Sequence, residues 1–72
     1  MNKSLKVMRA RRGLTQEQMA ERMGWSRQYY AKAENGKSIG SIRFWQRLQE
    51  AFNVPDEEMW DIVNDIKERE KV

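Results

Sequence analysis

The amino-acid sequence predicts an all-α protein of five short helices in one domain, residues 1–72. Apolar residues recur at spacings of three and four along successive stretches, which is the period of an amphipathic helix. A residue that commonly starts a helix precedes each stretch, namely Ser4, Thr15, Ser26, Ser41 and Pro55. A residue that commonly ends a helix follows the first four stretches, namely Gly13, Gly24, Asn35 with Gly36, and Asn53.

The first helix is expected over residues 4–12 and the second over residues 16–23. Thr15 is a good cap for the second helix, because Gln18 lies three residues on and its side chain can reach back to the backbone N–H of the cap. Both helices have an inward face of apolar side chains, which are Leu5 and Met8 on the first and Met19, Ala20 and Met23 on the second.

The third helix is expected over residues 27–35, after a break at Gly24-Trp25-Ser26. Only Tyr30 and Ala33 are available for its buried face, with Trp25 packing just before the cap. The opposite face is exposed and comprises Arg27, Gln28, Tyr29, Ala31 and Lys32. Such a face is rich in groups that hydrogen-bond to base edges and phosphates, so this helix is predicted to lie in the major groove of DNA.

These residues carry a family resemblance. The chain resembles the helix-turn-helix domain of the phage repressor and Cro class, also called lambda repressor-like or XRE, through the run from Leu14 to Glu21 and then Gly24, Ser26, Arg27 and Glu34-Asn35-Gly36-Lys37. The resemblance implies a five-helix DNA-binding domain whose helix-turn-helix spans about residues 15–35, on the second and third helices.

The resemblance also implies roles for single residues. The base-reading positions fall on Arg27, Gln28 and Lys32; arginine and lysine suit guanine O6 and N7, and glutamine suits adenine N6 and N7. As alternatives, Arg27 and Lys32 serve only phosphates, Gln16 is an ordinary surface residue, and Tyr29 meets a thymine methyl. The residues expected to bind phosphate are Gln16, Tyr29, Asn35 and Lys37, joined by Arg43 near the start of the fourth helix.

Three further expectations concern how this region is held. Arg9 directly follows the inward Met8, and the family pairs an arginine here with the glutamate that ends the third helix, in this chain Glu34; the alternative is an exposed Arg9 that touches phosphate. Tyr30 is expected in the core with its hydroxyl at the rim. Gly40 stands where the family frequently has proline, so we expect a more flexible loop before the fourth helix.

The fourth helix is expected over residues 42–52, with an inward stripe of Ile42, Trp45, Leu48 and Phe52 and with Ala51 beside it. The fifth is expected over about residues 56–70, where Met59 closes the core. Beyond Met59 the apolar stripe continues through Trp60, Ile62, Val63 and Ile66, which exceeds what so small a domain needs. We expect a homodimer contact there, formed by Trp60, Val63 and Ile66; the alternative is that the stripe packs back on the first helix.

Composition narrows the functional classes. The net charge is +3, but residues 1–37 carry nine Lys or Arg against three acids, whereas residues 38–72 carry five against eight. One face is therefore expected to meet a polyanion, unless the basic half is merely solvated. The chain has no Cys and no His, which removes disulfides, thiolate metal sites and the commonest general base. We expect no catalytic residues, no metal and no cofactor.

The predicted function is that of a sequence-specific DNA-binding transcription regulator, as a dimeric repressor on a palindromic double-stranded operator. An alternative is a protein-interaction module of antitoxin or anti-repressor type, which would bind a protein partner mainly through the C-terminal helix. No apolar run approaches the roughly 18 residues that span a membrane, and we expect neither a signal peptide nor membrane association. The expected location is the cytoplasm.

Overall fold

The computed structural model describes the backbone of residues 2–70 and the side chains of residues 2–66, and this part of the chain contains helices and no strand. The prediction of an all-α fold is confirmed. The helices are α1 (Lys3–Arg11), α2 (Gln16–Met23), α3 (Arg27–Glu34), α4 (Ile42–Phe52) and α5 (Asp56–Glu70). No helix in the described ranges is long and apolar enough to cross a membrane.

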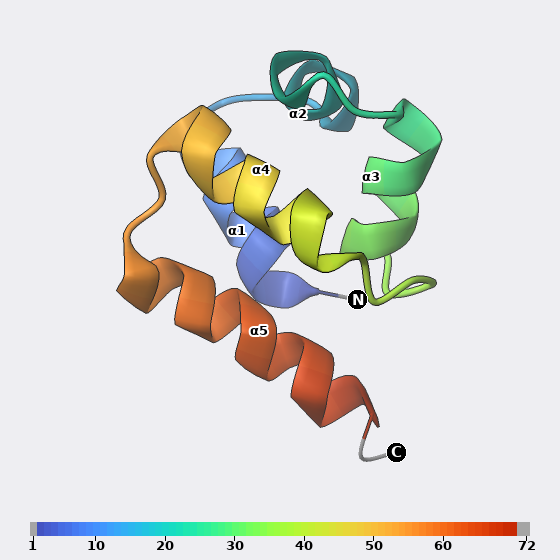
Figure 1. Cartoon of the computed structure of the whole chain (residues 1–72), viewed down its shortest axis with the longest axis vertical. Helices are drawn as coiled ribbons and strands as arrows, with labels where there is room; N and C mark the ends of the chain where they lie inside the picture. Colours follow the sequence, from blue (N-terminus) through green and yellow to red (C-terminus); the bar gives the residue numbers. More distant parts are fainter. Residues whose placement is uncertain (1, 71–72) are drawn as a thin grey trace.

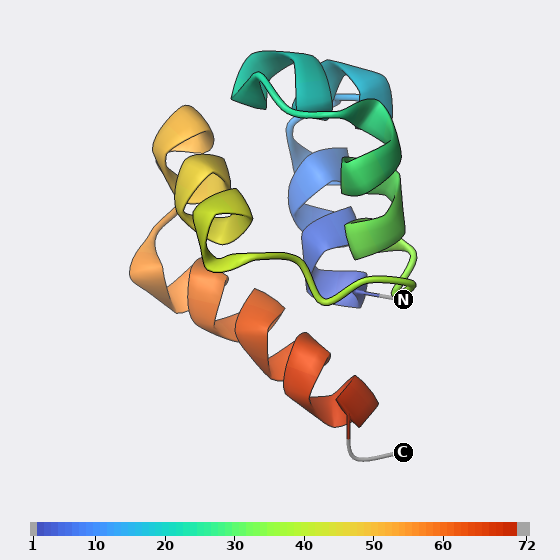
Figure 2. The same ribbon diagram turned by 45° about the vertical axis from the view of Figure 1, so that its right-hand side comes forward.

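The helices pack around one core, with α4 across the centre and α5 below it (Figure 1). Figure 2 shows α1 and α3 side by side, with α2 joining their upper ends. The largest side chains with almost no exposed surface come from all five helices and include Tyr30, Phe44, Leu5, Met19, Leu48 and Ile62. Within this core α3 packs against α1, α2 and α4, and one side of α3 is left to solvent.

Local signals for the helix ends were mostly correct. Thr15 and Gln18 form the reciprocal capping box, with both hydrogen bonds present. Ser26 and Ser41 cap α3 and α4 through their hydroxyls, and Gly24 ends α2 with a φ of 66°. These ends depend on residues within one turn of each other, which is why the sequence alone located them.

The prediction that Ser4 caps α1 was wrong. The cap is Asn2, whose Oδ1 accepts from Leu5 N at 3.0 Å while its Nδ2 donates to Ile62 O at 3.1 Å. Ser4 lies inside the helix, and its backbone N–H donates to Asp65 Oδ2 at 2.6 Å. The start of α1 is thus capped by Asn2 and is also bonded to α5 through Ile62 and Asp65.

The predicted inward stripe of α4 was also partly wrong. Ile42 is 76% exposed and Phe44, which was not expected inside, is fully buried, whereas Leu48 is buried and the half-buried Trp45 and Phe52 pack against the core as predicted. Phe44 and Leu48 share one side of the helix, and the Phe44 ring lies 4.8 to 6.1 Å, centroid to centroid, from four other aromatic rings. Burying this ring among aromatic neighbours is favourable in free energy. α4 is therefore rotated so that Phe44 faces the core and Ile42 faces solvent.

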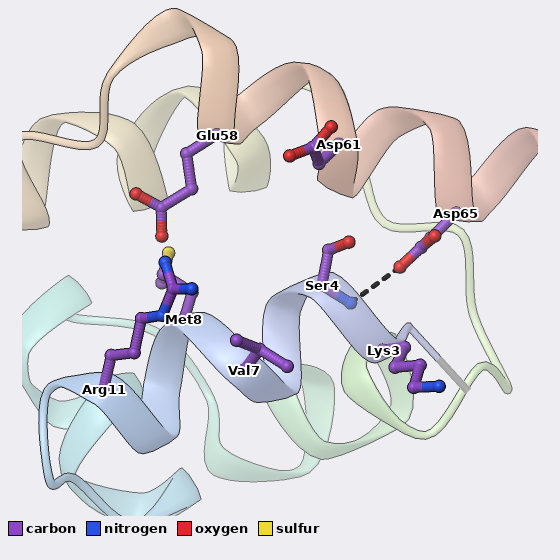
Figure 3. Close-up of a pocket in the computed structure, with 8 residues that line it drawn as sticks. All are labelled: Lys3, Ser4, Val7, Met8, Arg11, Glu58, Asp61 and Asp65. Atoms are coloured by element: carbon purple, nitrogen blue, oxygen red, sulfur yellow. Dashed lines mark hydrogen bonds between the residues drawn. The ribbon is translucent and has the colours of Figure 1, made fainter.

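The apolar stripe of α5 divides between two environments. Ile62 is fully buried, so for this residue the alternative of packing back onto the fold holds. Figure 3 shows α5 facing α1, with Asp65 reaching the Ser4 amide, and Arg12 pairs with Glu58 at 3.5 Å. Trp60 remains 60% exposed, and the predicted dimer residues Val63 and Ile66 are half-buried.

Candidate nucleic-acid interface

The outward side of α3 carries Arg27, Gln28 and Lys32, all of which are exposed. The structure therefore places the three predicted base-reading residues together on the surface of a single helix. Arg27 Nη1 lies 3.6 Å from Glu17 Oε2, but both side chains are about two-thirds exposed. An ion pair in that setting contributes little, so it does not prevent Arg27 from binding another group.

The buried carboxylate of Glu34 holds α3 in place. Only 1% of Glu34 is exposed, and its Oε1 accepts from Arg9 Nε at 2.8 Å. Arg9 Nη1 also donates to Leu14 O at 2.9 Å, so one guanidinium joins α1, α3 and the start of the helix-turn-helix. The hydrogen bond to Glu34 raises the pKa of Arg9 above its ordinary value. The ion pair that the family resemblance implied is thus present.

Two more side chains donate to the same carboxylate. Gln16 Nε2, from the first residue of α2, donates to Glu34 Oε2, and the Tyr30 hydroxyl donates to Glu34 Oε1 at 3.4 Å. The expectation that the Tyr30 hydroxyl lies at the rim was therefore wrong, since this residue has no exposed surface. Burial, together with the nearby Glu34 carboxylate, raises the pKa of Tyr30 above its usual value of 10.0.

Gln16 is half-buried and braces α3 through Glu34, at the end of that helix, whereas the family resemblance implied a brace at its start. A glutamine amide has two N–H groups, and one of them faces Glu34. The other is available for a phosphate contact, which stays a prediction.

Tyr29 lies differently from the expectation of an exposed side chain. It is half-buried, with its ring centroid 5.1 Å from that of Phe44 and 6.0 Å from that of Trp25. Its hydroxyl accepts a hydrogen bond from Ser41 N at 2.8 Å. Tyr29 thus connects α3 to Ser41, the residue that caps α4. The sequence alone could not predict this contact, because it depends on how the two helices pack together.

The loop between α3 and α4 is held by several contacts. Trp45 Nε1 donates to Ile39 O at 3.0 Å, and Gly40 N donates to Ser38 Oγ at 3.3 Å. Gly40 has a φ of +83°, and a Cβ built there would lie 2.9 Å from Trp45 Nε1. The loop is therefore more tightly held than the exchange of proline for glycine suggested, because Trp45 packs where a side chain would stand.

Exposed polar groups flank α3 on its C-terminal side. Asn35 and Lys37 follow the helix directly and Arg43 lies in the first turn of α4; all three are exposed. The N–H of Lys37 donates to Lys32 O at 2.9 Å, which turns the chain sharply at this point. Asn35, Lys37 and Arg43, which are predicted to bind phosphate, therefore lie on the segments that follow the predicted base-reading helix.

Comparison with known proteins decides the family. A family model described as a helix-turn-helix domain matches residues 4–60. The chain belongs to the helix-turn-helix family. It is also 32% identical, over 68 aligned residues, to an uncharacterized HTH-type transcriptional regulator of Archaeoglobus fulgidus, an alignment that covers 83% of this chain and 97% of the relative. No solved structure matches the chain significantly.

Family membership confirms the predicted phage repressor and Cro type of helix-turn-helix. The chain is a helix-turn-helix DNA-binding regulator and not an enzyme. Within this helix-turn-helix, α2 is the first helix and α3 is the recognition helix, which in this class enters the major groove.

Proposed function

We propose that this helix-turn-helix protein represses transcription by binding a palindromic operator as a homodimer. The observation that carries the proposal is the arrangement of α3, whose outward side presents Arg27, Gln28 and Lys32 while its inward side is locked by Glu34. A rigid helix with donors on its free side is the geometry that reads base edges in the major groove. Repression would follow from occupying a promoter, which is an inference by analogy.

Phosphate contacts would set the orientation of the recognition helix on DNA. The proposed contacts are Gln16 at the start of α2, and Asn35, Lys37 and Arg43 in the segments that follow α3. Such contacts carry no sequence information by themselves but supply much of the affinity and make it salt-dependent. Binding to the genome would place the protein in the cytoplasm of a cell without a nucleus.

The proposal is tested by comparing two substitutions on the exposed surface. Gln28→Ala should relax the preference at one base pair and cost about 1 to 3 kcal/mol on the specific site. Lys37→Ala should weaken binding to all sequences about equally and lower the salt slope by about one unit. Both are measured by titration of specific and random duplexes at several salt concentrations.

The division of roles would be wrong if both variants lost specific and nonspecific binding in the same proportion. Failure of the wild-type protein to bind any genomic fragment would contradict the proposed function itself. Neither residue contributes to the core, so circular dichroism serves as the control for folding.

An apolar groove supports the dimer. It has a volume of about 530 Å³ and lies between the loop before α4, α4 itself and α5, with Ile39, Ile42, Trp45, Val63 and Ile66 among the residues that line it. Trp60 lies on α5 near the groove residue Val63 and is 60% exposed. We propose that the groove and Trp60 form a two-fold interface, because a single helix-turn-helix reads few base pairs and two units about 34 Å apart gain specificity.

The same groove favours one alternative function. A helix of another protein would also cover its apolar surface, as expected for an antitoxin or anti-repressor module. The mass in solution separates the two functions. A chain that stays monomeric at high concentration and binds no genomic fragment favours the protein-interaction module, whereas a dimer that binds DNA favours the repressor.

A further inference from the structure

The cap of α4 lacks a group that the cap of α2 has. In α2, the N–H of the cap residue Thr15 donates to the side chain of Gln18, three residues on, at 2.9 Å. In α4, the cap residue is Ser41, and the residue three positions on is Phe44, which has no acceptor. The sequence of α4 therefore supplies only half of a capping box.

Tyr29 supplies the missing acceptor from the recognition helix. Its hydroxyl oxygen accepts from Ser41 N at 2.8 Å, across twelve residues of sequence. Ser41 Oγ meanwhile accepts from Phe44 N at 3.1 Å, as the other half of the box requires. The N–H and the hydroxyl oxygen of Ser41 thus both have hydrogen-bond partners, the first on α3 and the second within α4.

Packing fixes the position of the Tyr29 hydroxyl. The Tyr29 ring lies against Phe44 with a centroid distance of 5.1 Å, and the Trp25 ring meets it nearly edge-on at 6.0 Å. Because Phe44 belongs to the first turn of α4, the ring and the hydroxyl contact the same turn from two directions. Rotation of α4 relative to α3 would disturb both contacts.

This contact lies between two groups of proposed DNA contacts. The base-reading residues are on α3, whereas Arg43 projects from the first turn of α4, two residues after Ser41. A base-reading helix is useful only when the phosphate contacts hold it at the correct depth and register. The bond from Ser41 N to the Tyr29 hydroxyl joins the backbone at the start of that turn directly to a side chain of α3.

We propose that Tyr29 is a positioning residue, which completes the cap of α4 and so holds Arg43 in register with the recognition helix. This inference rests on the proposed DNA-binding function. It assigns the contribution of the Tyr29 hydroxyl to its bond with Ser41, in place of a direct contact with phosphate.

The first test needs no DNA. Tyr29→Phe keeps the ring and removes only the hydroxyl, so the amide of Ser41 should exchange with solvent about fivefold faster, as measured by NMR. Tyr30→Phe is the matched control, because it removes the hydroxyl of the neighbouring tyrosine, which bonds Glu34, and leaves Ser41 bonded to Tyr29. Unchanged exchange at Ser41 in Tyr29→Phe would overturn the proposal.

The second test is a double-mutant cycle on the selected operator. Arg43→Ala should weaken binding several-fold in the wild-type background and clearly less in Tyr29→Phe, because Arg43 has already lost its register there. Lys32→Ala, on α3 itself, should have the same effect in both backgrounds. Equal effects of Arg43→Ala in the two backgrounds would overturn the proposal and favour a direct phosphate contact by Tyr29.

The two tests separate this inference from the proposed function. If the wild-type protein binds no DNA, the proposed function fails, and the exchange of Ser41 still decides whether Tyr29 holds the α4 cap. If the wild-type protein binds DNA and the cycle shows no coupling, only the positioning role fails.

Discussion

At the scale of single residues, Glu34 collects hydrogen bonds from three helices on one buried carboxylate. Arg9 comes from α1, Gln16 from α2 and Tyr30 from α3 itself. The backbone carbonyl of Glu34 also accepts from Asn2 N at 2.8 Å. A buried charge is tolerated only when it is paired and hydrogen-bonded, so these donors depend on one another.

Removing the positive partner should therefore be costly. Arg9→Met leaves the Glu34 carboxylate buried without its counter-charge, and we expect the free energy of unfolding to fall by about 3 kcal/mol. The measurement is urea denaturation followed by circular dichroism.

The double variant Arg9→Met with Glu34→Met is the control. It removes both charges and should recover a large part of that loss. Additive losses in the double variant would show that the two side chains stabilise the fold independently, contrary to our interpretation.

Tyr30 is expected to make the stability of the fold depend on pH in the alkaline range. Its pKa is raised in the folded state, mainly by burial, so the folded state favours the protonated phenol. The stabilisation is complete below the ordinary pKa of 10.0 and is lost as the pH rises toward the raised value.

We expect the free energy of unfolding to fall above about pH 10 by up to 1.4 kcal/mol per pH unit. Tyr30→Phe should remove this part of the pH dependence, and Tyr29→Phe, which leaves Tyr30 in place, should retain it. Urea denaturation from about pH 8 to about pH 11 measures the difference. Parallel curves for the wild-type protein and Tyr30→Phe would contradict the account.

At the scale of elements, the loop before α4 depends on Gly40 for two reasons. Its φ of +83° disfavours any side chain, and Trp45 occupies the space that a Cβ would fill. Gly13 also has a positive φ, of +65°, but a Cβ there would meet nothing within 4 Å. A side chain at Gly13 would therefore strain the backbone only, whereas a side chain at Gly40 would strain the backbone and also clash with Trp45.

Gly40→Ala should destabilise the protein by about 1 kcal/mol more than Gly13→Ala, because only Gly40→Ala also displaces Trp45. The indole fluorescence of the folded state should change in Gly40→Ala as well. Thermal denaturation of the two variants provides the comparison. Equal losses would show that Trp45 does not press on Gly40.

The sequence predicted where the helices begin and end better than it predicted which side of each helix faces the core. The caps at Thr15, Ser26 and Ser41 depend on neighbours within one turn, and local pattern was sufficient to place them. The choice between Ile42 and Phe44 for the inner side of α4 depends on rings from other segments. Spacing alone permits both stripes, since each leads to Leu48.

The candidate site was predictable to a similar extent. The exposure of Arg27, Gln28 and Lys32 followed from the buried side of the same helix. The contacts of Gln16 with Glu34 and of Tyr29 with Ser41 join residues that are far apart in sequence. Such contacts between elements leave no periodic pattern, so only the structure revealed them.

At the scale of the whole molecule, the proposed dimer would bury the apolar groove, so a charge introduced there should weaken the dimer. Ile42 lines that groove, and 76% of it is exposed in the single chain. Ile42→Glu should leave the fold intact and introduce a charge that a two-fold interface would have to bury. We expect a shift from dimer to monomer and at least tenfold weaker binding to a palindromic site.

Ala10→Glu, on the exposed surface of α1, is the matched control and should leave the mass unchanged. Sedimentation across a range of concentrations measures both variants. A wild-type chain that is monomeric throughout, or a dimer indifferent to Ile42→Glu, would show that this groove is not the interface.

Selection of bound sequences from random DNA would show whether the outward side of α3 reads bases. The wild-type protein should enrich a two-fold symmetric site with half-sites about one helical turn apart. In the same selection, Gln28→Ala should lose the preference at one position of each half-site. Enrichment of no sequence, or an identical site for the wild-type protein and Gln28→Ala, would show that α3 does not read bases in this way.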